Sequence, residues 1–284
     1  YNVSAARVHR NEAQWKNTDL EVYSYAARFD FEINKDHRLK AVLRGSDRYK
    51  GYYENSATGY GPAVEPADPN DEINGRDILA GLEYKGRVVP IWETTLRLGY
   101  FLFDQDTISR APNAVSPVGG FSATAGKTLS SERRPSLDWQ NDITAFESAD
   151  GNVRDVVSVG ANVEQESFEQ DDSIYFSNAD VERTNWSVFV QNRLELYKRA
   201  FITLGGRREQ HGLFGGFTTG RCDVSILVPE SDTRIHGSVG NAFRAPSFYE
   251  FFSAFGNPDL SPEKNFAYDA GIEQHFWKKR ITAG

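Results

Sequence analysis

Hydrophobic and polar residues alternate with a period of two along most of the chain. Apolar side chains occupy every second position in the segments 25–33, 96–102, 157–163 and 266–272 and, apart from Asn192, in 186–196, with mostly polar, charged or small residues between them. Successive side chains of a β-strand point to opposite faces, so this period predicts strands with one apolar and one polar face. No segment shows the period of an amphipathic helix. The pattern predicts an all-β, antiparallel protein.

The predicted strands are too long for an ordinary globular sheet. The alternation continues through the segments 20–34, 38–53, 92–108, 153–170 and 183–196, whereas strands of globular proteins average about 5–6 residues. A tilted strand that crosses a bilayer needs about 9–11 residues within the hydrocarbon alone. The strand length therefore favours a transmembrane β-barrel over a sandwich or a propeller.

Short and long connections alternate between these strands. Compact turn signals occur at 34–37, 85–87, 148–151, 197–199, 229–232 and 277–279. Longer connections rich in Gly, Pro, Ser and Asp are expected at 54–75, 109–134, 170–182, 211–221 and 242–264. Outer-membrane barrels have short periplasmic turns and long external loops, and the spacing predicts about thirteen strands of such a barrel. Its polar faces, with charges such as Arg28, Arg44, Glu164 and Glu166, would line a wet interior.

Composition and charge exclude several other classes of protein. The 32 Lys and Arg residues against 40 Asp and Glu give a net charge of −8, whereas a nucleic-acid partner requires a basic face. The single cysteine, Cys222, can form no internal disulfide and is expected to be a small packing residue. The histidines are scattered, and the sequence contains no nucleophile, Walker or dinucleotide-binding motif. No enzymatic activity and no catalytic residue are therefore expected.

Residues 240–263 form a dense motif, GNAFRAPSFYEFFSAFGNPDLSPE. This segment resembles a stretch of TonB-dependent outer-membrane receptors, closest to the cobalamin and siderophore group. The matching residues are Gly240, Phe243, Arg244, Ala245, Pro246, Ser247, Glu250, Gly256, Asn257, Pro258, Leu260, Pro262 and Glu263. The next residues, Tyr268, Gly271, Ile272 and Glu273, resemble the family's following strand.

The resemblance implies both a fold and a function. Members of the family are 22-stranded barrels that enclose an N-terminal plug in the outer membrane of Gram-negative bacteria. They import a scarce ligand, such as a ferric siderophore or cobalamin, with energy passed on by TonB. Residues 1–284 would then be part of one receptor barrel domain, without the plug and the C-terminal strands. The implied partners are a metal chelate or another scarce ligand, the TonB complex through the plug, and outer-membrane lipid.

Within the motif we expect architecture more than direct ligand contact. Its prolines cannot donate to a strand ladder, so the segment is expected to be a loop. Arg244 with Glu250 or Glu263 is expected to form a charged clasp near the rim of the barrel. An aromatic cluster above the membrane is expected from Phe248, Tyr249, Phe251, Phe252 and Phe255.

Ligand contacts are expected in the long external loops. Tyr52, Tyr53, Tyr60, Phe121 and Tyr175 could stack on a flat ligand, although loop aromatics also pack on one another. Asp68, Asp71 and Glu72 place oxygen atoms densely enough to hold Ca²⁺. The alternative is a solvated acidic loop without a metal, and no other cofactor is expected.

Two other functions stay open for the sequence. A passive porin-like channel would share the strands and the alternating connections, but it has no reason to carry the motif at 240–263. A soluble all-β domain that binds or cleaves carbohydrate would show short strands and a repeat of about 40–50 residues. The chain shows neither feature.

Overall fold

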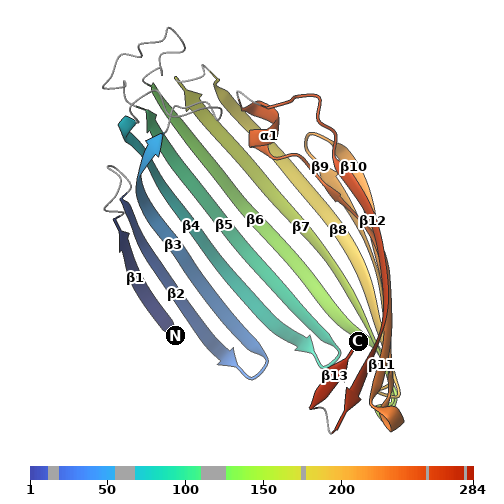
Figure 1. The fold of residues 1–284 in the computed structure, drawn as a ribbon. Helices are drawn as coiled ribbons and strands as arrows, with labels where there is room; N and C mark the ends of the chain where they lie inside the picture. The colour runs from blue at the N-terminus through green and yellow to red at the C-terminus, as the bar shows by residue number, and fades with distance from the viewer. Residues whose placement is uncertain (12–18, 55–67, 110–125, 174–176, 254–255, 278–279) are drawn as a thin grey trace.

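The computed structural model is one antiparallel sheet of thirteen strands, which follow one another in chain order from β1 to β13. It describes residues 1–284 apart from 12–18, 55–67, 110–125, 174–176, 254–255 and 278–279, and the side chains of 52–54, 68–70 and 109 are also outside the description. The sheet curves into a wall, and the strands from β2 to β8 slant side by side across it (Figure 1). The predicted fold class, an antiparallel transmembrane β-barrel, is confirmed for this part of the barrel wall.

The elements follow the chain without any crossover connection. The strands are β1 Asn2–Arg10, β2 Leu20–Asn34, β3 His37–Glu54, β4 Asp68–Val89, β5 Trp92–Ser109, β6 Gly126–Glu147, β7 Val153–Asp172, β8 Ala179–Leu196, β9 Ala200–His211, β10 Gly215–Val228, β11 Thr233–Arg244, β12 Glu263–Phe276 and β13 Ile281–Ala283. Two short helices lie between strands, the 3₁₀-helix η1 Pro229–Ser231 and the α-helix α1 Phe248–Phe252. Among the described residues, no helix has the length and apolar character needed to cross a bilayer.

The register separates polar and apolar side chains onto two faces. One row of direct cross-strand neighbours from β3 to β7 is polar and consists of Lys40, Glu83, Arg97, Asp138 and Asn162. The adjacent row points to the other face and consists of Ala41, Leu82, Leu98, Leu137 and Val163. In a barrel that crosses lipid, the apolar face contacts the bilayer and the polar face lines the lumen.

The apolar side chains are arranged for lipid and not for an internal core. Among the described residues, the buried hydrophobic side chains are Phe168 and Phe248 alone. Large apolar residues of the outer face stay exposed, for example Leu98 at 49% and Val190 at 53%. An apolar surface of this extent needs a non-aqueous environment. The apolar side chains of this fold are therefore removed from water mainly by membrane lipid and not by a protein core.

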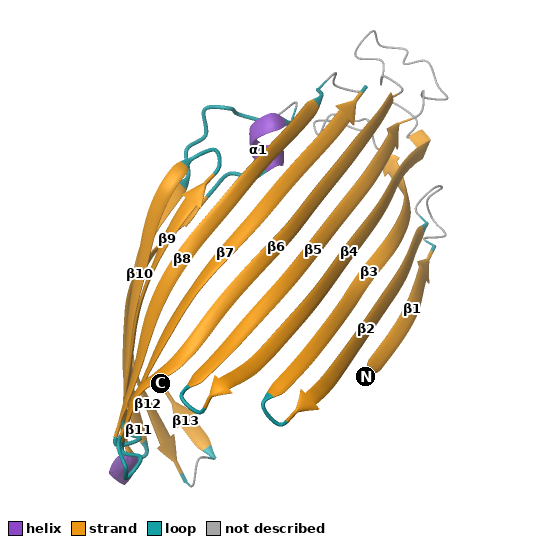
Figure 2. Ribbon diagram, turned by 180° about the vertical axis from the view of Figure 1, so that it is seen from behind, coloured by secondary structure: helices purple, strands orange, loops and turns teal. Residues whose placement is uncertain are grey.

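Most predicted turns are confirmed, and they gather at one end of the sheet. The connections at 148–151, 197–199 and 229–232 lie between consecutive strands, and Tyr197 and Lys198 have positive φ angles of 52° and 55°. Such paired positive angles are typical of tight hairpin turns. Figure 2 shows the short turns at one end and α1 at the opposite end, which we assign to the periplasmic and extracellular sides.

The turn predicted at 85–87 is wrong. These residues lie inside β4, and the chain turns at Pro90 and Ile91. Gly86 provides space for neighbouring rings, because a Cβ on it would meet the Tyr84 hydroxyl at 2.4 Å and His37 Nδ1 at 2.7 Å. Its lack of a side chain therefore serves packing on a strand and not a change of chain direction.

The long connection predicted at 211–221 is also wrong. Strands β9 and β10 pair as far as His211 and Gly215, so only residues 212–214 form the connection. Gly215 has a φ of +79°, which glycine adopts without steric cost. The glycines and threonines of 215–220, which suggested a loop, instead continue the ladder of β10.

Candidate functional site at the extracellular mouth

The motif at 240–263 connects β11 to β12 on the extracellular side. Gly240, Phe243 and Arg244 end β11, and Glu263 begins β12. Between them Ser247 caps α1, after which the chain returns through the tight turn at 257–260. The loop expected from the prolines is therefore present, and it also contains a helical turn that the alternation of residues did not reveal.

Ser247 and Glu250 hold the helical turn through reciprocal hydrogen bonds. The Glu250 amide donates to Ser247 Oγ at 3.2 Å, and the Ser247 amide donates to Glu250 Oε2 at 2.8 Å. This arrangement is a capping box. Arg244 Nη2 donates to Glu250 Oε1 at 2.6 Å, and Arg244 Nη1 lies 3.4 Å from Glu263 Oε1. The clasp expected at the rim thus uses both carboxylates and ties the two strand ends to the helix.

Phe248 anchors this segment to the lumen face of β7 and β8. Its side chain is 5% exposed, and its ring stacks on Phe168 with 5.5 Å between ring centroids. On β8, the Arg183 guanidinium carbon lies 4.1 Å from the centre of the Phe248 ring, within cation–π range. Arg183 Nη1 also donates to the Pro246 carbonyl at 3.4 Å. Helix α1 therefore lies against the inside of the wall, past the intervening β9–β10 hairpin (Figure 1).

Glu166 is the polar centre beneath this anchor. Its side chain is 7% exposed, and it forms ion pairs with Arg183 and, at 3.4 Å, with Arg134. Asn185 Nδ2 donates to the same carboxylate at 3.0 Å. A buried carboxylate is stable only when its charge is compensated and its oxygens are hydrogen-bonded. This arrangement fixes the orientation of Arg183, which in turn contacts the loop.

The turn between β9 and β10 adds aromatic contacts to the same site. The rings of His211 and Phe214 lie 5.0 Å apart, and Phe214 meets Phe251 of α1 edge-on at 5.8 Å. The Gly212 amide donates to Asn185 Oδ1 at 3.0 Å, which connects the turn to the Glu166 centre. Of the expected aromatic cluster, Phe248, Phe251 and Phe252 pack together. Tyr249 is 61% exposed, and Phe255 lies outside the described residues.

Acidification is expected to loosen the segment 245–262. Hydrogen bonds from the Ser247 amide, the Arg244 guanidinium and the Ser247 hydroxyl lower the pKa of Glu250 to about 2. Because this pKa lies below the ordinary carboxyl value of about 4.3, the stabilisation is complete above that value and is lost as the pH falls through about 2. We expect amide-exchange protection at residues 250–257, corrected for intrinsic rates, to decline between about pH 5 and pH 2.

The variant Glu250→Gln is the control for this pH effect. It should show weaker protection that no longer changes over this pH range, because the titrating carboxylate is absent. Equal protection of the wild-type segment at pH 2 and pH 6 would contradict the assignment.

The proposed ligand-contacting aromatics lie at or beyond the ends of described strands. The backbones of Tyr52 and Tyr53 belong to the last residues of β3, and their side chains are outside the description. Tyr60, Phe121 and Tyr175 lie outside the described residues. Their contact with a ligand stays a prediction.

The candidate calcium residues all fall at the start of β4. Asp71 is fully buried, Glu72 is partly exposed, and the Asp68 side chain is outside the description. Within the described part of the chain, no group of three or more His, Cys, Asp or Glu residues could hold a metal ion. Calcium binding at Asp68, Asp71 and Glu72 stays a prediction.

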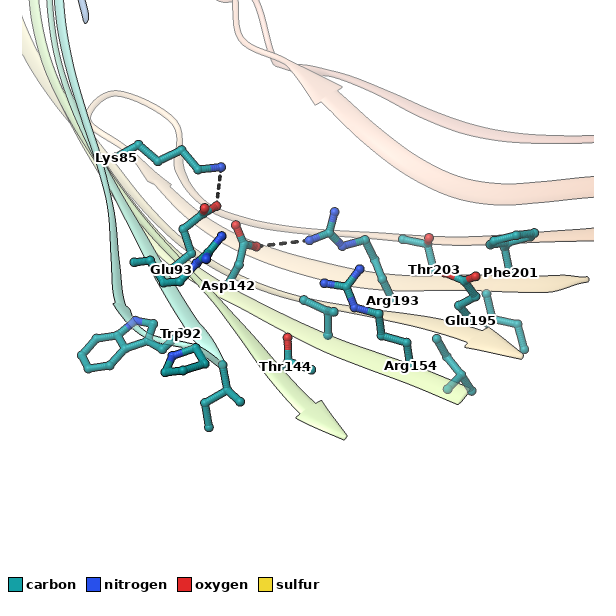
Figure 3. Close-up of a pocket in the computed structure, with 16 residues that line it drawn as sticks. Lys85, Trp92, Glu93, Asp142, Thr144, Arg154, Arg193, Glu195, Phe201 and Thr203 are labelled. Carbon is teal, nitrogen blue, oxygen red and sulfur yellow. Dashed lines mark hydrogen bonds and ion pairs between the residues drawn. The ribbon is translucent and has the colours of Figure 1, made fainter. Parts of the chain in front are cut away.

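A second polar site lies on the lumen face at the periplasmic end. A cavity of about 530 Å³ opens between β4 and β9, lined by charged residues that include Lys85, Glu93, Arg154 and Arg193 (Figure 3). Lys85 pairs with Glu93, and Arg193 Nη2 lies 3.3 Å from Asp142 Oδ1. Arg154 has no ion-pair partner among the described side chains. This surface can bind a polar protein segment or a hydrated solute.

Residues of the anchor were only partly identifiable from the sequence. Glu166 belongs to the charges expected on the lumen face, but Arg183, Asn185 and Phe168 carried no motif. Strand parity alone places Arg183 and Asn185 on one face of β8. Their convergence with Phe248 depends on the path of a loop that returns over two other strands.

Known proteins with this fold were found by sequence and by structure. The model of the family "TonB dependent receptor-like, beta-barrel" matches residues 6–284. The ferric-catecholate import receptor Fiu from K12 E. coli has a TM-score of 0.72 at 11% identity, with 99% of this chain and 52% of that chain covered. The siderophore receptor PirA from Acinetobacter baumannii has a TM-score of 0.69 at 14% identity, with 94% and 43% covered.

A third structure with this fold is that of a peptide transporter. The RagAB peptide transporter has a TM-score of 0.65 at 14% identity, with 93% of this chain and 39% of that chain covered. The chain thus spans about half, or less, of the length of these structures. At such low identities the likeness establishes the fold. Together with the family match over nearly the whole chain, it shows that this protein belongs to the TonB-dependent receptor-like β-barrel family, whose barrels lie in the outer membrane of Gram-negative bacteria.

Proposed function

We propose that this chain forms part of the wall of a receptor that imports a scarce metal chelate, such as a ferric siderophore or cobalamin, with energy supplied through TonB. The observation that carries the proposal is the position of the motif segment. Phe248 of α1 packs against Phe168 and Arg183 and so holds the segment against the lumen face. A loop that folds inward at the mouth would present its polar and aromatic groups to an entering solute. This arrangement suits a receptor that captures its ligand before it releases it inward.

The periplasmic cavity supports the same proposal. Its lining of Lys85, Glu93, Arg154 and Arg193 offers charges of both signs to a protein segment inside the barrel. A plug of complementary charge would bind there and close the lumen, and TonB would act on that plug. A passive channel is the alternative, and it requires a lumen that stays open.

Uptake by the full-length receptor tests the proposal. The gene would be expressed in an outer-membrane strain with and without a functional TonB system, and the uptake of cobalamin and of a panel of ferric siderophores would be measured. We expect one of these ligands to enter only when TonB is functional. Uptake that is independent of TonB would contradict the proposal and favour a passive channel.

Ligand contact by the tyrosines at the end of β3 can be tested by measuring the affinity of the full-length receptor for the imported ligand. We expect the double variant Tyr52→Ala, Tyr53→Ala to bind the imported ligand about tenfold more weakly, since an aromatic contact contributes about 0.5–1.5 kcal/mol beyond its buried area. The control is Tyr197→Ala, which alters an exposed tyrosine at a periplasmic turn. Barrel assembly should be normal in both variants. Unchanged affinity in the double variant would remove these tyrosines from the site.

A further inference from the structure

Strand β3 carries a line of basic residues on its lumen face. Arg38, Lys40, Arg44, Arg48 and Lys50 all have the same strand parity. The ion pair between Lys40 Nζ and Glu83 Oε1, at 2.9 Å, places this parity on the polar face. Arg44, Arg48 and Lys50, which we call the β3 column, lie between the middle of the strand and its extracellular end and are exposed.

The neighbouring strands provide one ion pair for the three charges of the β3 column. Its direct neighbours on β2 and β4 are Leu20, Val22, Ala26, Ile73, Gly75 and Leu79. Among the described side chains, Asp77 is the carboxylate that pairs with the β3 column, and its Oδ1 lies 3.5 Å from Arg48 Nη2. The same oxygen accepts a hydrogen bond from Ser46 Oγ. Arg44 and Lys50 have no ion-pair partner within the described ranges.

Most other basic side chains that the structure describes on the lumen face are ion-paired. Arg134 and Arg183 share Glu166, and Arg134 also meets Glu132 at 2.6 Å. Further around the wall, Arg207 pairs with Glu209 at 3.1 Å. Paired charges produce little potential at a distance, whereas unneutralised charges of one sign in a partly enclosed wall attract and concentrate counter-charged solutes. Outside the periplasmic cavity, where Arg154 is also unpaired, the positive potential of the described wall is therefore concentrated at β3.

We infer that the β3 column attracts and guides an anionic ligand, so that the imported chelate carries net negative charge. This inference rests on the proposed function and specifies its substrate class. Carboxylate and catecholate groups can form charge-assisted hydrogen bonds with guanidinium and ammonium groups. The column stays exposed and hydrated, so it can bind an anion weakly and release it again. The apolar neighbours on β2 and β4 provide no counter-charge for Arg44 and Lys50, so both side chains can bind an anionic ligand.

The electrostatic potential at the column can be measured without transport. A cysteine would be placed at Ser24, which lies directly opposite Ser46 on β2 and diagonal to Arg44 and Arg48. The matched control is a cysteine at Ser130 of β6, which lies in the cross-strand row of Arg48 on the same face. Both variants would be made in the full-length receptor with Cys222→Ser. The rates of modification by anionic and cationic methanethiosulfonate reagents would then be compared.

We expect the ratio of anionic to cationic reaction rates to be about tenfold higher at Ser24→Cys than at Ser130→Cys, given Coulomb energies at roughly 7–8 Å in water. The triple change Arg44→Gln, Arg48→Gln, Lys50→Gln should remove this difference, and so should about 1 M salt, where the Debye length is about 3 Å. Equal ratios at the two cysteines would overturn the inference. A cysteine at Ser24 that neither reagent modifies would also overturn it, because the column would then be covered by a protein surface.

Uptake measurements test the charge of the imported ligand, whereas the reagent rates test only the electrostatic potential at β3. For an anionic tris-catecholate iron(III) complex, the triple variant should raise the uptake KM about tenfold, while a cationic trihydroxamate complex should be unaffected. The matched control is Arg207→Gln, Arg221→Gln, Arg234→Gln, which removes the same charge from ion-paired positions on the lumen face. Equal effects of the two triple variants would overturn the inference. Reagent rates do not depend on TonB, so a failure of the proposed function leaves them measurable.

Discussion

Replacing Phe248 with alanine is expected to release the segment 245–262 from the barrel wall and to increase its amide exchange about 100-fold. The Phe248 side chain is 5% exposed and loses both its Phe168 stack and its Arg183 contact. Truncation of a buried phenylalanine costs about 3–5 kcal/mol, and each 1.4 kcal/mol is a factor of ten in an opening equilibrium. Hydrogen–deuterium exchange of the full-length receptor in lipid nanodiscs measures this effect at residues 250–257.

A neighbouring substitution separates the anchor from a general weakening of α1. Tyr249→Ala changes the same helical turn but removes a side chain that is 61% exposed, so we expect wild-type exchange. Phe168→Ala removes the other ring of the stack from β7 and should reproduce the effect of Phe248→Ala. Wild-type protection in Phe248→Ala would show that other contacts hold the segment.

Glu166→Gln is expected to lower the free energy of unfolding of the barrel by about 3–5 kcal/mol, as is found when one partner of a buried ion pair is removed. The Glu166 and Arg183 side chains are 7% and 9% exposed, so water cannot solvate the arginine that is left behind. Arg134 loses its second carboxylate at the same time. Guanidinium unfolding of the full-length receptor, refolded into lipid vesicles, measures the change.

Two further variants define the origin of this loss. Glu230→Gln removes a carboxylate that is 63% exposed and paired with Arg199 at the periplasmic turn, so it should leave the stability unchanged. Replacing both Glu166 and Arg183 with methionine should cost less than Glu166→Gln alone, because no unpaired charge then stays buried. Full wild-type stability in Glu166→Gln would contradict a structural role for the pair.

The contacts of Phe248 also explain how the motif segment is fixed at the mouth of the barrel. Arg244, Ser247 and Glu250 fold the loop on itself through charged and capping hydrogen bonds. Phe248 attaches the folded loop to a different part of the wall through its stack on Phe168. The motif therefore combines a self-contained turn with one aromatic contact to β7 and β8. A ligand that binds at the mouth would meet this unit as part of the inner surface.

Pattern alone determined much of this protein. The period of two predicted the strands, their length predicted a membrane barrel, and the prolines and charges of 240–263 predicted a clasped loop. These features follow from local chemistry, because alternation, chain reach and the missing amide of proline act on neighbouring residues.

Tertiary structure decided the features that depend on register. Gly86 appeared to mark a turn, yet its partners across the ladder place it inside β4 beside the Tyr84 and His37 rings. The meeting of Phe248 with Phe168 and Arg183 joins residues distant along the chain through the path of a loop. The same holds for the β3 column, whose charges were visible in the sequence. That Arg44 and Lys50 lack partners among the described side chains became clear only when the register set apolar residues beside them, because neutralisation depends on which side chains lie across the ladder.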